Sequence, residues 1–307
     1  MHLLILGAGG TGGYFGGRLA QAGADVSFLV RPARAAALRA DGLRIRSPLG
    51  DAHLPVDTVT AAELPARVAA RPLDLVLLAC KAYDLDSAIE AVAPAVGPGT
   101  AVLPILNGLL HYPVLDARFG RGRVLGGLCF ISATLAPEGE ILHLGRPASI
   151  TFGERDGGSS ARVEAFAALC AKAGIDHRAT PDIGQEQWIK FSFPAALAAG
   201  TCLMRASVGQ IVAGEGGEDL MAALHEECLA VAAAEGQPVP DKARDIARAS
   251  LVQAGSDVKA SMLRDLEAGN RVEAAHIVGD MWHRARRHGQ PAPLLQAAWV
   301  NLQAYQR

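Results

Sequence analysis

The sequence predicts an α/β domain built on a doubly wound parallel sheet, followed by an all-helical domain. Three observations carry this prediction. An apolar strand at the N-terminus runs directly into a glycine-rich turn that opens a helix. Strands and helices then alternate up to about residue 180, and the strands are continuous apolar runs typical of a buried parallel sheet. Beyond Pro181 only helical spacing remains, so we expect domains at 1–180 and 181–307.

The turn after the first strand has the G-x-G-x-x-G pattern of a Rossmann-type dinucleotide loop. Gly7 permits the tight turn, Gly9 lets phosphates approach the backbone, and Gly12 lets the helix pack close to the strand. This arrangement presents a pyrophosphate to the N-terminus of a helix. We therefore assign the loop to cofactor binding, with Gly7, Gly9, Gly10, Thr11 and Gly12 as its residues.

The end of the second strand indicates which dinucleotide binds. An NAD site usually has an acidic residue about 20 positions beyond the motif, where it accepts bonds from the ribose 2′-hydroxyl. Arg31 stands at that position, and its guanidinium suits a 2′-phosphate. We therefore expect NADP(H), although a solvated arginine at a strand end is the alternative.

The remaining elements follow from apolar runs and from glycine and proline breaks. Strands are expected at 2–6, 25–30, 73–79 and 100–106, with helices at 11–22, 32–40, 61–69, 84–93 and 111–118. A hairpin is expected within 43–57, further strands at 123–131, 140–144 and 148–153, then a helix at 159–173 and a strand at 175–179. Ligands bind beyond the carboxyl ends of such strands, so we expect a cleft between the domains.

Composition narrows the class of protein. The chain has 307 residues, 50% hydrophobic and 20% charged, and a formal net charge of −2, which argues against a nucleic-acid partner. Its five cysteines lack C-x-x-C spacing and suggest a reducing compartment, and its histidines show no metal-ligand pattern. We find no signal peptide or apolar run that could span a membrane, and we expect a cytoplasmic protein without a metal.

Short polar segments follow three of the strands. Lys81 could contact the adenosine phosphate or a substrate carboxylate, or be a surface lysine. Asn107, in an Asn-Gly pair, offers a ligand an amide, although the pair also suits a simple turn. Ser132 is small and polar, and we expect it under the nicotinamide.

One lysine of the helical region is a candidate for acid catalysis. Lys190 lies among aromatic residues and alanines on a largely apolar helix, where a charge is costly without a partner. Burial lowers the pKa of a lysine and suits it to act as a general acid. A lysine whose ammonium group reaches solvent is the competing interpretation.

With these residues in place, the whole chain resembles the 2-dehydropantoate 2-reductase (ketopantoate reductase) family of NADP-dependent oxidoreductases. The matching stretches include GAGGTGGYFGGRLAQAGADVSFLVR, KAYDLDSAI, LNGLLHYPVL, WIKF, ASVGQI and ASMLRDLEAGNRVEAAHIVGDM, in the family's order. The resemblance implies a Rossmann domain followed by a helical domain, as expected above.

The resemblance also implies residue roles. Lys190 matches the general acid that protonates the carbonyl oxygen, and Glu273 matches the glutamate that orients the lysine and the substrate. Asn107 matches the asparagine near nicotinamide and substrate, and Ser261 matches the serine that contacts the substrate carboxylate. Arg31 and Lys81 match the basic residues that hold the 2′-phosphate.

The chain departs from the family pattern around the lysine. Ketopantoate reductases carry asparagines four and eight residues after it, and here these substrate-binding positions are Pro194 and Ala198. Pro194 lacks an N–H and is expected to kink the helix, freeing the Lys190 carbonyl. A site without the two amides cannot select a substrate hydroxyl, so we expect a divergent paralogue with a more apolar pocket.

Three hypotheses therefore stand. The first is an NADPH-dependent reductase of a 2-oxo acid or related small carbonyl compound. The second is a true 2-dehydropantoate 2-reductase of pantothenate biosynthesis with a rearranged pocket. The third is a non-catalytic NADP(H)-binding sensor, against which Lys190 and Glu273 argue, since a binder needs neither. Ala-rich helices at 218–235 and 293–304 can pack within one chain or between two, so a homodimer stays open.

Overall fold

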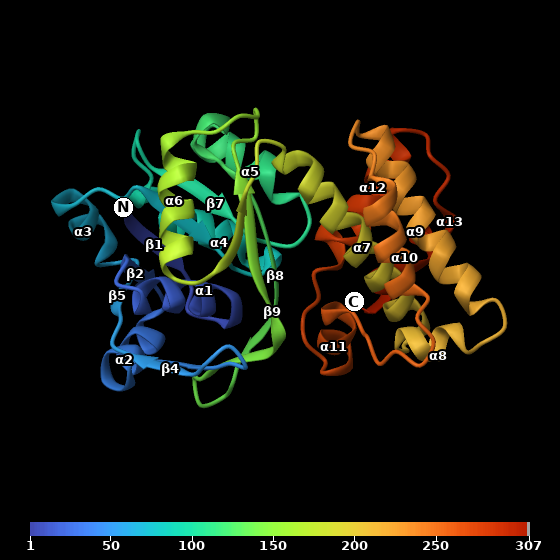
Figure 1. The fold of residues 1–307 in the computed structure, drawn as a ribbon, viewed down its shortest axis with the longest axis horizontal. Helices are drawn as coiled ribbons and strands as arrows, with labels where there is room; N and C mark the ends of the chain where they lie inside the picture. The colour runs from blue at the N-terminus through green and yellow to red at the C-terminus, as the bar shows by residue number, and fades with distance from the viewer. Residues whose placement is uncertain (306–307) are drawn as a thin grey trace. The chain divides into compact units, whose positions relative to one another are not determined.

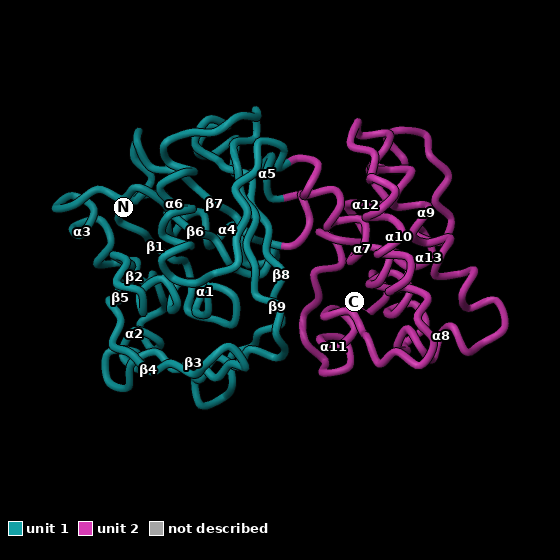
Figure 2. Tube along the Cα trace, viewed as in Figure 1, with its two compact units in different colours: residues 1–106, 111–183 teal, residues 107–110, 184–307 magenta. Residues whose placement is uncertain are grey.

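The computed structural model describes residues 1–305 and divides into two compact units (Figure 2). Unit 1 comprises Met1–Leu106 and His111–Ile183, and unit 2 comprises Asn107–Leu110 and Gly184–Arg307. The second boundary lies close to the expected one at 180/181. The segment Asn107–Leu110 groups with unit 2, whereas the sequence analysis had put it in the first domain.

Unit 1 is built on a five-stranded sheet in the order β5-β2-β1-β6-β7, in which all neighbours are parallel (Figure 1). Its strands are β1 (His2–Leu6), β2 (Asp25–Leu29), β5 (Asp57–Val59), β6 (Leu75–Leu78) and β7 (Ala101–Pro104). The chain runs outward from β1 to β2 and β5, then returns to the other side of β1 for β6 and β7. This order confirms the predicted Rossmann-type sheet.

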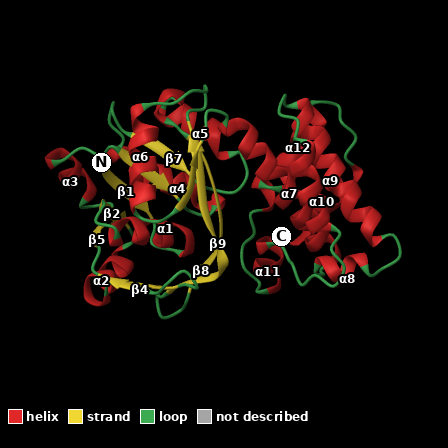
Figure 3. Ribbon diagram, in the orientation of Figure 1, coloured by secondary structure: helices red, strands yellow, loops and turns green. Residues whose placement is uncertain are grey.

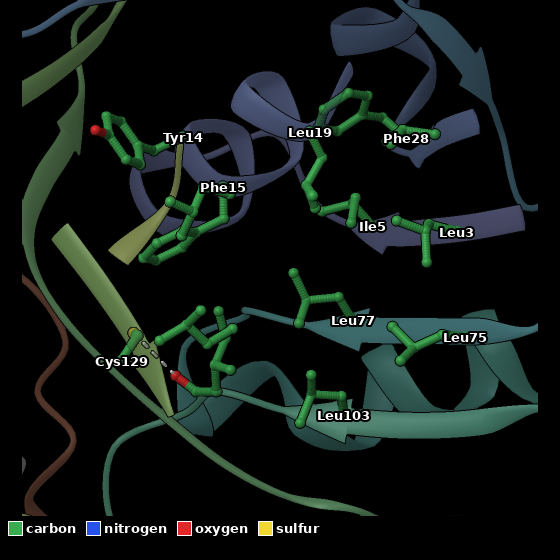
Figure 4. Packing of buried hydrophobic residues seen from close by; sticks show 14 of the residues in the cluster. Leu3, Ile5, Tyr14, Phe15, Leu19, Phe28, Leu75, Leu77, Leu103 and Cys129 are labelled. Carbon is green, nitrogen blue, oxygen red and sulfur yellow. Dashed lines mark hydrogen bonds between the residues drawn. The ribbon is translucent and has the colours of Figure 1, made fainter. Parts of the chain in front are cut away.

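The core of unit 1 lies on the face of the sheet that helix α1 (Gly10–Gln21) covers. Alternate residues of neighbouring strands share this face, and Leu3, Leu75 and Leu77 are fully buried there. Figure 4 shows these side chains with Phe15 and Leu19 of α1. The apolar runs of the sequence reflect burial on both faces, since Leu4, Val76 and Val102 are equally inaccessible.

Unit 1 also contains a second, mixed sheet in the order β10-β9-β3-β4, with β8 paired to β9. Its strands are β3 (Leu43–Arg46), β4 (Ala52–Leu54), β8 (Gly126–Leu135), β9 (Ile141–Gly153) and β10 (Asp176–Ala179). The strands expected at 140–144 and 148–153 form the single strand β9. The register with β8 jumps from Ala133↔His143 to Ile131↔Ala148, so residues 144–147 leave the ladder and give the sequence its apparent break.

Helices complete unit 1 near their predicted positions. They are α2 (Pro32–Asp41), α3 (Leu64–Ala70), α4 (Leu85–Val92), α5 (His111–Phe119) and α6 (Ala161–Lys172), with 3-10 turns η1 (Ala82–Asp84), η2 (Ala93–Ala95) and η3 (Arg121–Arg123). Ser160 caps α6, because its hydroxyl accepts a bond from the Val163 amide. The fold thereby matches the alternation seen in the sequence.

Every element in the described part of unit 2 is a helix, as predicted (Figure 3). They are α7 (Ile183–Met204), α8 (Val208–Val212), α9 (Gly217–Ala234), α10 (Asp241–Leu251), α11 (Ser261–Glu267), η4 (Ala274–His276), α12 (Val278–Arg287) and α13 (Pro293–Tyr305). Helix α7 continues through Pro194 without a break. Over residues 1–305, no helix combines the length and the apolar character needed to span a bilayer.

Candidate cofactor and catalytic site

The glycine-rich loop lies at the point where the strand order of the parallel sheet reverses. It follows β1. From β1 the chain continues to β2 on one side of this strand and later returns to β6 on the other side. Gly12 fixes α1 against this point, because a Cβ there would lie 2.7 Å from the Gly7 carbonyl oxygen and 3.2 Å from the Ala79 Cβ. Open α/β sheets bind their ligands at such a reversal.

The loop fits a dinucleotide pyrophosphate. Gly7 has a φ of +86°, which favours glycine for backbone reasons. Gly9 has an ordinary φ of −86°, and a Cβ there would meet nothing within 4 Å. Neither strain nor packing requires glycine at position 9, so a ligand that approaches the backbone explains it. The residues present therefore fit the cofactor.

The N-terminus of α1 is open to an anion. Its N-cap, Gly9, provides no capping side chain, and the first turn contains no acidic residue. No carboxylate of this turn therefore competes for the first amides of the helix, among them the amide of Thr11. The helix dipole favours negative charge at this end. Gly10 brings the turn against β8, since its Cβ would lie 2.5 Å from the Ala133 carbonyl oxygen.

Ser132 lies beside this contact. It is exposed and occupies the register shift of β8 between Ile131 and Ala133. A bulge re-aims the side chain of the extra residue and is common next to binding sites. The structure thus brings Ser132 to the glycine loop, while its role under a nicotinamide stays a prediction.

The predicted 2′-phosphate residues follow β2 and β6, the two strands that flank β1 in the parallel sheet. Arg31 comes after β2, is exposed and is the N-cap residue of α2. Lys81 comes after β6, is exposed and precedes the 3-10 turn η1. Both stand at the carboxyl edge of the sheet, where the loop lies.

Arg34 also belongs to the glycine loop region, although no sequence motif indicates it. Its Nη2 donates to the carbonyl oxygens of Ala8 (3.2 Å) and Gly139 (3.0 Å), so it ties the glycine loop to the turn between β8 and β9. Burial, with Arg44 nearby, lowers the pKa of this arginine, and its Nε is buried without a partner. Its position on the first turn of α2, three residues after Arg31, was the available signal.

In unit 2, Lys190 and Asn107 form the polar centre of the candidate catalytic group. The Lys190 Nζ donates to the Asn107 Oδ1 over 3.2 Å, and both residues are half-buried. They are separated by 83 positions along the chain. The predicted acid and the predicted substrate amide thus come together, although no sequence period connects them.

The neighbouring glycine explains the Asn-Gly pair. Gly108 has a φ of +76°, and a Cβ there would lie 2.4 Å from the His276 carbonyl oxygen. His276 belongs to η4, which Glu273 precedes as N-cap residue; the Glu273 carbonyl accepts from the His276 amide over 3.1 Å. Glu273 is 6% exposed, a low value for a carboxylate. Gly108 therefore brings the asparagine loop against the segment that carries the glutamate.

The other predicted substrate residues have different settings. Ser261 is exposed and is the first residue of α11. Pro194 is half-buried inside α7, and Ala198, one turn further along, is only 2% exposed. The contacts of these three residues with a substrate stay predictions.

Neither metal nor disulfide chemistry is suggested by the described part of the chain. Within residues 1–305, no group of three or more His, Cys, Asp or Glu residues could hold a metal. All five cysteines are free. Burial raises the pKa of the Cys170 and Cys202 thiols to about 12, so both are inert thiols of the core.

The parallel sheet and the glycine loop together are those of Rossmann-type dinucleotide-binding proteins. Two family models match the chain: "Ketopantoate reductase PanE/ApbA" over residues 3–157 and "Ketopantoate reductase PanE/ApbA C terminal" over residues 182–306. The chain therefore belongs to the ketopantoate reductase family. This confirms the resemblance drawn from the sequence.

Individual relatives agree with this assignment. The chain is 37% identical to "Uncharacterized oxidoreductase YkpB" of Bacillus subtilis, over 100% of this chain and 99% of the relative. The crystal structure of 2-dehydropantoate 2-reductase from Methylococcus capsulatus matches with a TM-score of 0.88 and 32% identity, over 100% of this chain and 97% of that one. D-mandelate dehydrogenase, solved with NADH and anilino(oxo)acetate, shares the fold with a TM-score of 0.87 at 18% identity, over 99% and 98% of the chains.

Proposed function

We propose that this protein is an NADPH-dependent reductase of a 2-oxo acid with an apolar side chain. The observation that carries the proposal is the Lys190–Asn107 hydrogen bond of 3.2 Å, in a chain that also has a dinucleotide loop. A binding module needs no half-buried ammonium group held by an amide. This argues against a sensor without turnover.

The bound cofactor would supply a hydride to the carbonyl carbon of the substrate. Lys190 would give an Nζ proton to the carbonyl oxygen, so that an N–H bond breaks as the product O–H bond forms. Asn107 holds the ammonium group in place and offers its amide N–H to the same oxygen. We assign to Glu273 the orientation of the lysine and to Ser261 a contact with the substrate carboxylate, as in the family.

Arg31 and Lys81 support the choice of NADPH over NADH. Both are exposed cations at the carboxyl edge of the parallel sheet, and Arg31 stands where an NAD site usually has a carboxylate. A guanidinium can bind a 2′-phosphate through two parallel hydrogen bonds. D-mandelate dehydrogenase was solved with NADH, so the fold alone does not select the cofactor.

The two candidates for the substrate differ at Pro194 and Ala198. The name of the Methylococcus capsulatus structure favours ketopantoate, whereas two apolar residues in place of asparagines favour a substrate without a hydroxyl. A buried hydroxyl left without a partner costs about 1–3 kcal/mol. We therefore place ketopantoate behind branched and aromatic 2-oxo acids by roughly 5- to 150-fold in kcat/KM.

The test is NADPH oxidation with a panel of 2-oxo acids under one set of conditions. The proposal expects turnover that requires a carboxylate and increases with an apolar tail. Ketopantoate as the best substrate would identify a true 2-dehydropantoate 2-reductase and refute the apolar-pocket argument. Tight NADPH binding without turnover of any member would favour the sensor.

A further inference from the structure

Trp188 and Lys190 lie two positions apart on α7, so their side chains project about 200° apart around the helix axis. Lys190 reaches Asn107, whereas the Trp188 indole is buried at 6% exposure and packs against Phe191, with 5.7 Å between the ring centroids. Any rotation of α7 that moved the indole would also move the ammonium group. The contacts of Trp188 therefore bear on the position of Lys190.

The partner of Trp188 on a second helix is a guanidinium. Arg284 of α12 lies over the indole, 5.3 Å from the ring centroid, which is within cation–π range. Its side chain is 12% exposed, so the interaction is largely desolvated and stronger than one at the surface.

Two carboxylates hold this guanidinium in place. The Arg284 Nε donates to the Asp280 Oδ2 and the Nη1 donates to the Glu235 Oε2, both over 2.9 Å. The Asp280 and Glu235 side chains are 3% and 19% exposed. A planar fork bonded at two nitrogens has little freedom to rotate. The plane of the guanidinium over the indole is therefore fixed from α9 and α12.

Two features of the α7 backbone lie around the lysine. Pro194 has no N–H, so this residue cannot donate a backbone hydrogen bond to the preceding turn. One turn earlier, the Ser192 hydroxyl donates to the Trp188 carbonyl over 2.8 Å, and bonds of this type slightly weaken or bend a helix. Both features lie in the part of α7 that carries the proposed acid.

We propose that Arg284, fixed by Asp280 and Glu235, is a positioning residue that sets the direction of Lys190 through the Trp188 indole. This inference rests on the proposed function, in which Lys190 is the proton donor. Arg284 touches no reacting atom in it. Its role is to keep the Nζ of Lys190 at the carbonyl oxygen when the substrate is bound.

Helix α12 provides matched controls. Arg286 forms a similar cation–π pair with Trp282, with 5.0 Å from its guanidinium carbon to the ring centroid. Arg286 is exposed, and this pair does not involve Trp188. Arg287 shares Glu235 with Arg284 at 3.1 Å, but its side chain is 61% exposed. Arg286→Met thus removes a cation–π contact and Arg287→Met removes a Glu235 contact, both from the same helix and neither at Trp188.

The first experiment compares kinetics of the full-length variants. Arg284→Met should lower kcat by ~10- to 100-fold, the cost of a small misplacement of a reacting group, while the NADPH dissociation constant stays unchanged. Arg284→Lys should restore little, because an ammonium group lacks the planar fork that directs one N–H to Asp280 and another to Glu235. Both control variants should keep wild-type kcat. Equal kcat for folded Arg284→Met and wild type would overturn the proposal.

The second experiment does not depend on turnover. The chain has five lysines, so competitive acetylation followed by mass spectrometry resolves each amine. Arg284→Met should change the labelling rate of Lys190 at least ~3-fold and leave the rates of Lys172 and Lys242 unchanged, because the rate depends on the exposure and the pKa of each amine. If Arg284→Met fails to fold, Glu235→Gln and Trp188→Phe are labelled in its place, and both should change the labelling rate of Lys190 in the same direction. An unchanged labelling rate of Lys190 in every folded variant would refute the positioning role. Wild-type inactivity toward all 2-oxo acids would refute only the proposed function.

Discussion

The two units of the molecule define their candidate sites in different ways. In unit 1 the cofactor loop is one contiguous segment, and its function depends on where side chains are absent: Gly9 leaves open space and Gly12 permits close packing. In unit 2 the candidate catalytic group joins Lys190 to Asn107 across 83 positions, and its proposed function depends on side chains that are present. A binding loop is thus a local property of the chain, whereas the acid site is a property of the packed helices.

Replacing Lys190 tests unit 2 and should have the largest effect. Lys190→Ala should lower kcat by ~10² or more, the usual scale of general acid catalysis. The NADPH dissociation constant should stay unchanged, since the loop in unit 1 is intact. Lys172→Ala, at an exposed lysine of α6, is the control. Near-normal turnover of Lys190→Ala would remove the lysine from the mechanism, and Glu273→Gln should also impair turnover.

Replacing Arg31 makes the complementary test in unit 1. Wild-type protein should bind NADPH at least ~10-fold more tightly than NADH, about 1.4 kcal/mol. Arg31→Ala should narrow this difference without changing the affinity for NADH, because only the 2′-phosphate loses a partner. Fluorescence titration with both nucleotides measures the two constants. Equal constants in the wild type would refute the choice of NADPH.

A pair of glycine variants separates ligand space from folding. Gly9→Ala should weaken NADPH binding by ~10-fold and leave the Tm unchanged, because only a ligand occupies the space beside it. Gly108→Ala should lower stability by about 1–2 kcal/mol or more, because its φ of +76° penalises a Cβ and the His276 carbonyl oxygen lies in the way. Thermal unfolding with and without NADPH checks both. A destabilised Gly9→Ala would show that packing, not ligand, requires this glycine.

The last expected effect, which arises only in acid, concerns the stability of unit 2. Burial, then Arg248 and Arg244, lowers the pKa of His225 to about 4, and this histidine is 1% exposed. His225 therefore binds a proton near pH 6.5 in the unfolded chain but only near pH 4 in the folded chain. Its stabilising contribution is present above pH 6.5 and is lost as the pH falls toward 4, by up to ~1.4 kcal/mol per pH unit. His225→Gln should flatten this part of the urea-unfolding profile, and an unchanged slope would contradict the assignment.

Much of the fold followed from local signals. The glycine loop, the apolar strands and the change to helical spacing after Pro181 predicted the parallel sheet and the helical unit. The second sheet was not foreseen as a sheet, because β3 pairs with β9 across roughly 100 residues and no local pattern shows such a pairing. Helix α7 runs through Pro194 without a break, and the kink expected there stays a prediction.

The candidate site was predicted less evenly. The residues of the loop, Arg31 and Lys190 could be selected from spacing and residue type. Arg34 was missed because its two bonds run to backbone carbonyls, which no sequence motif records. Arg284 was missed because a charged residue on a helix usually marks a solvated face, and only the packing against Trp188 shows otherwise.

The central claim of the proposal is that bound NADPH would supply the hydride while Lys190 would give the proton. Single-turnover reduction of an apolar 2-oxo acid with NADPH deuterated at C4 of the nicotinamide tests it most directly. The account predicts product with deuterium at C2 from wild-type protein, and ~10²-fold slower deuterium transfer in Lys190→Ala at saturating cofactor. Deuterium transfer at the wild-type rate in Lys190→Ala, or a product without deuterium at C2, would contradict it.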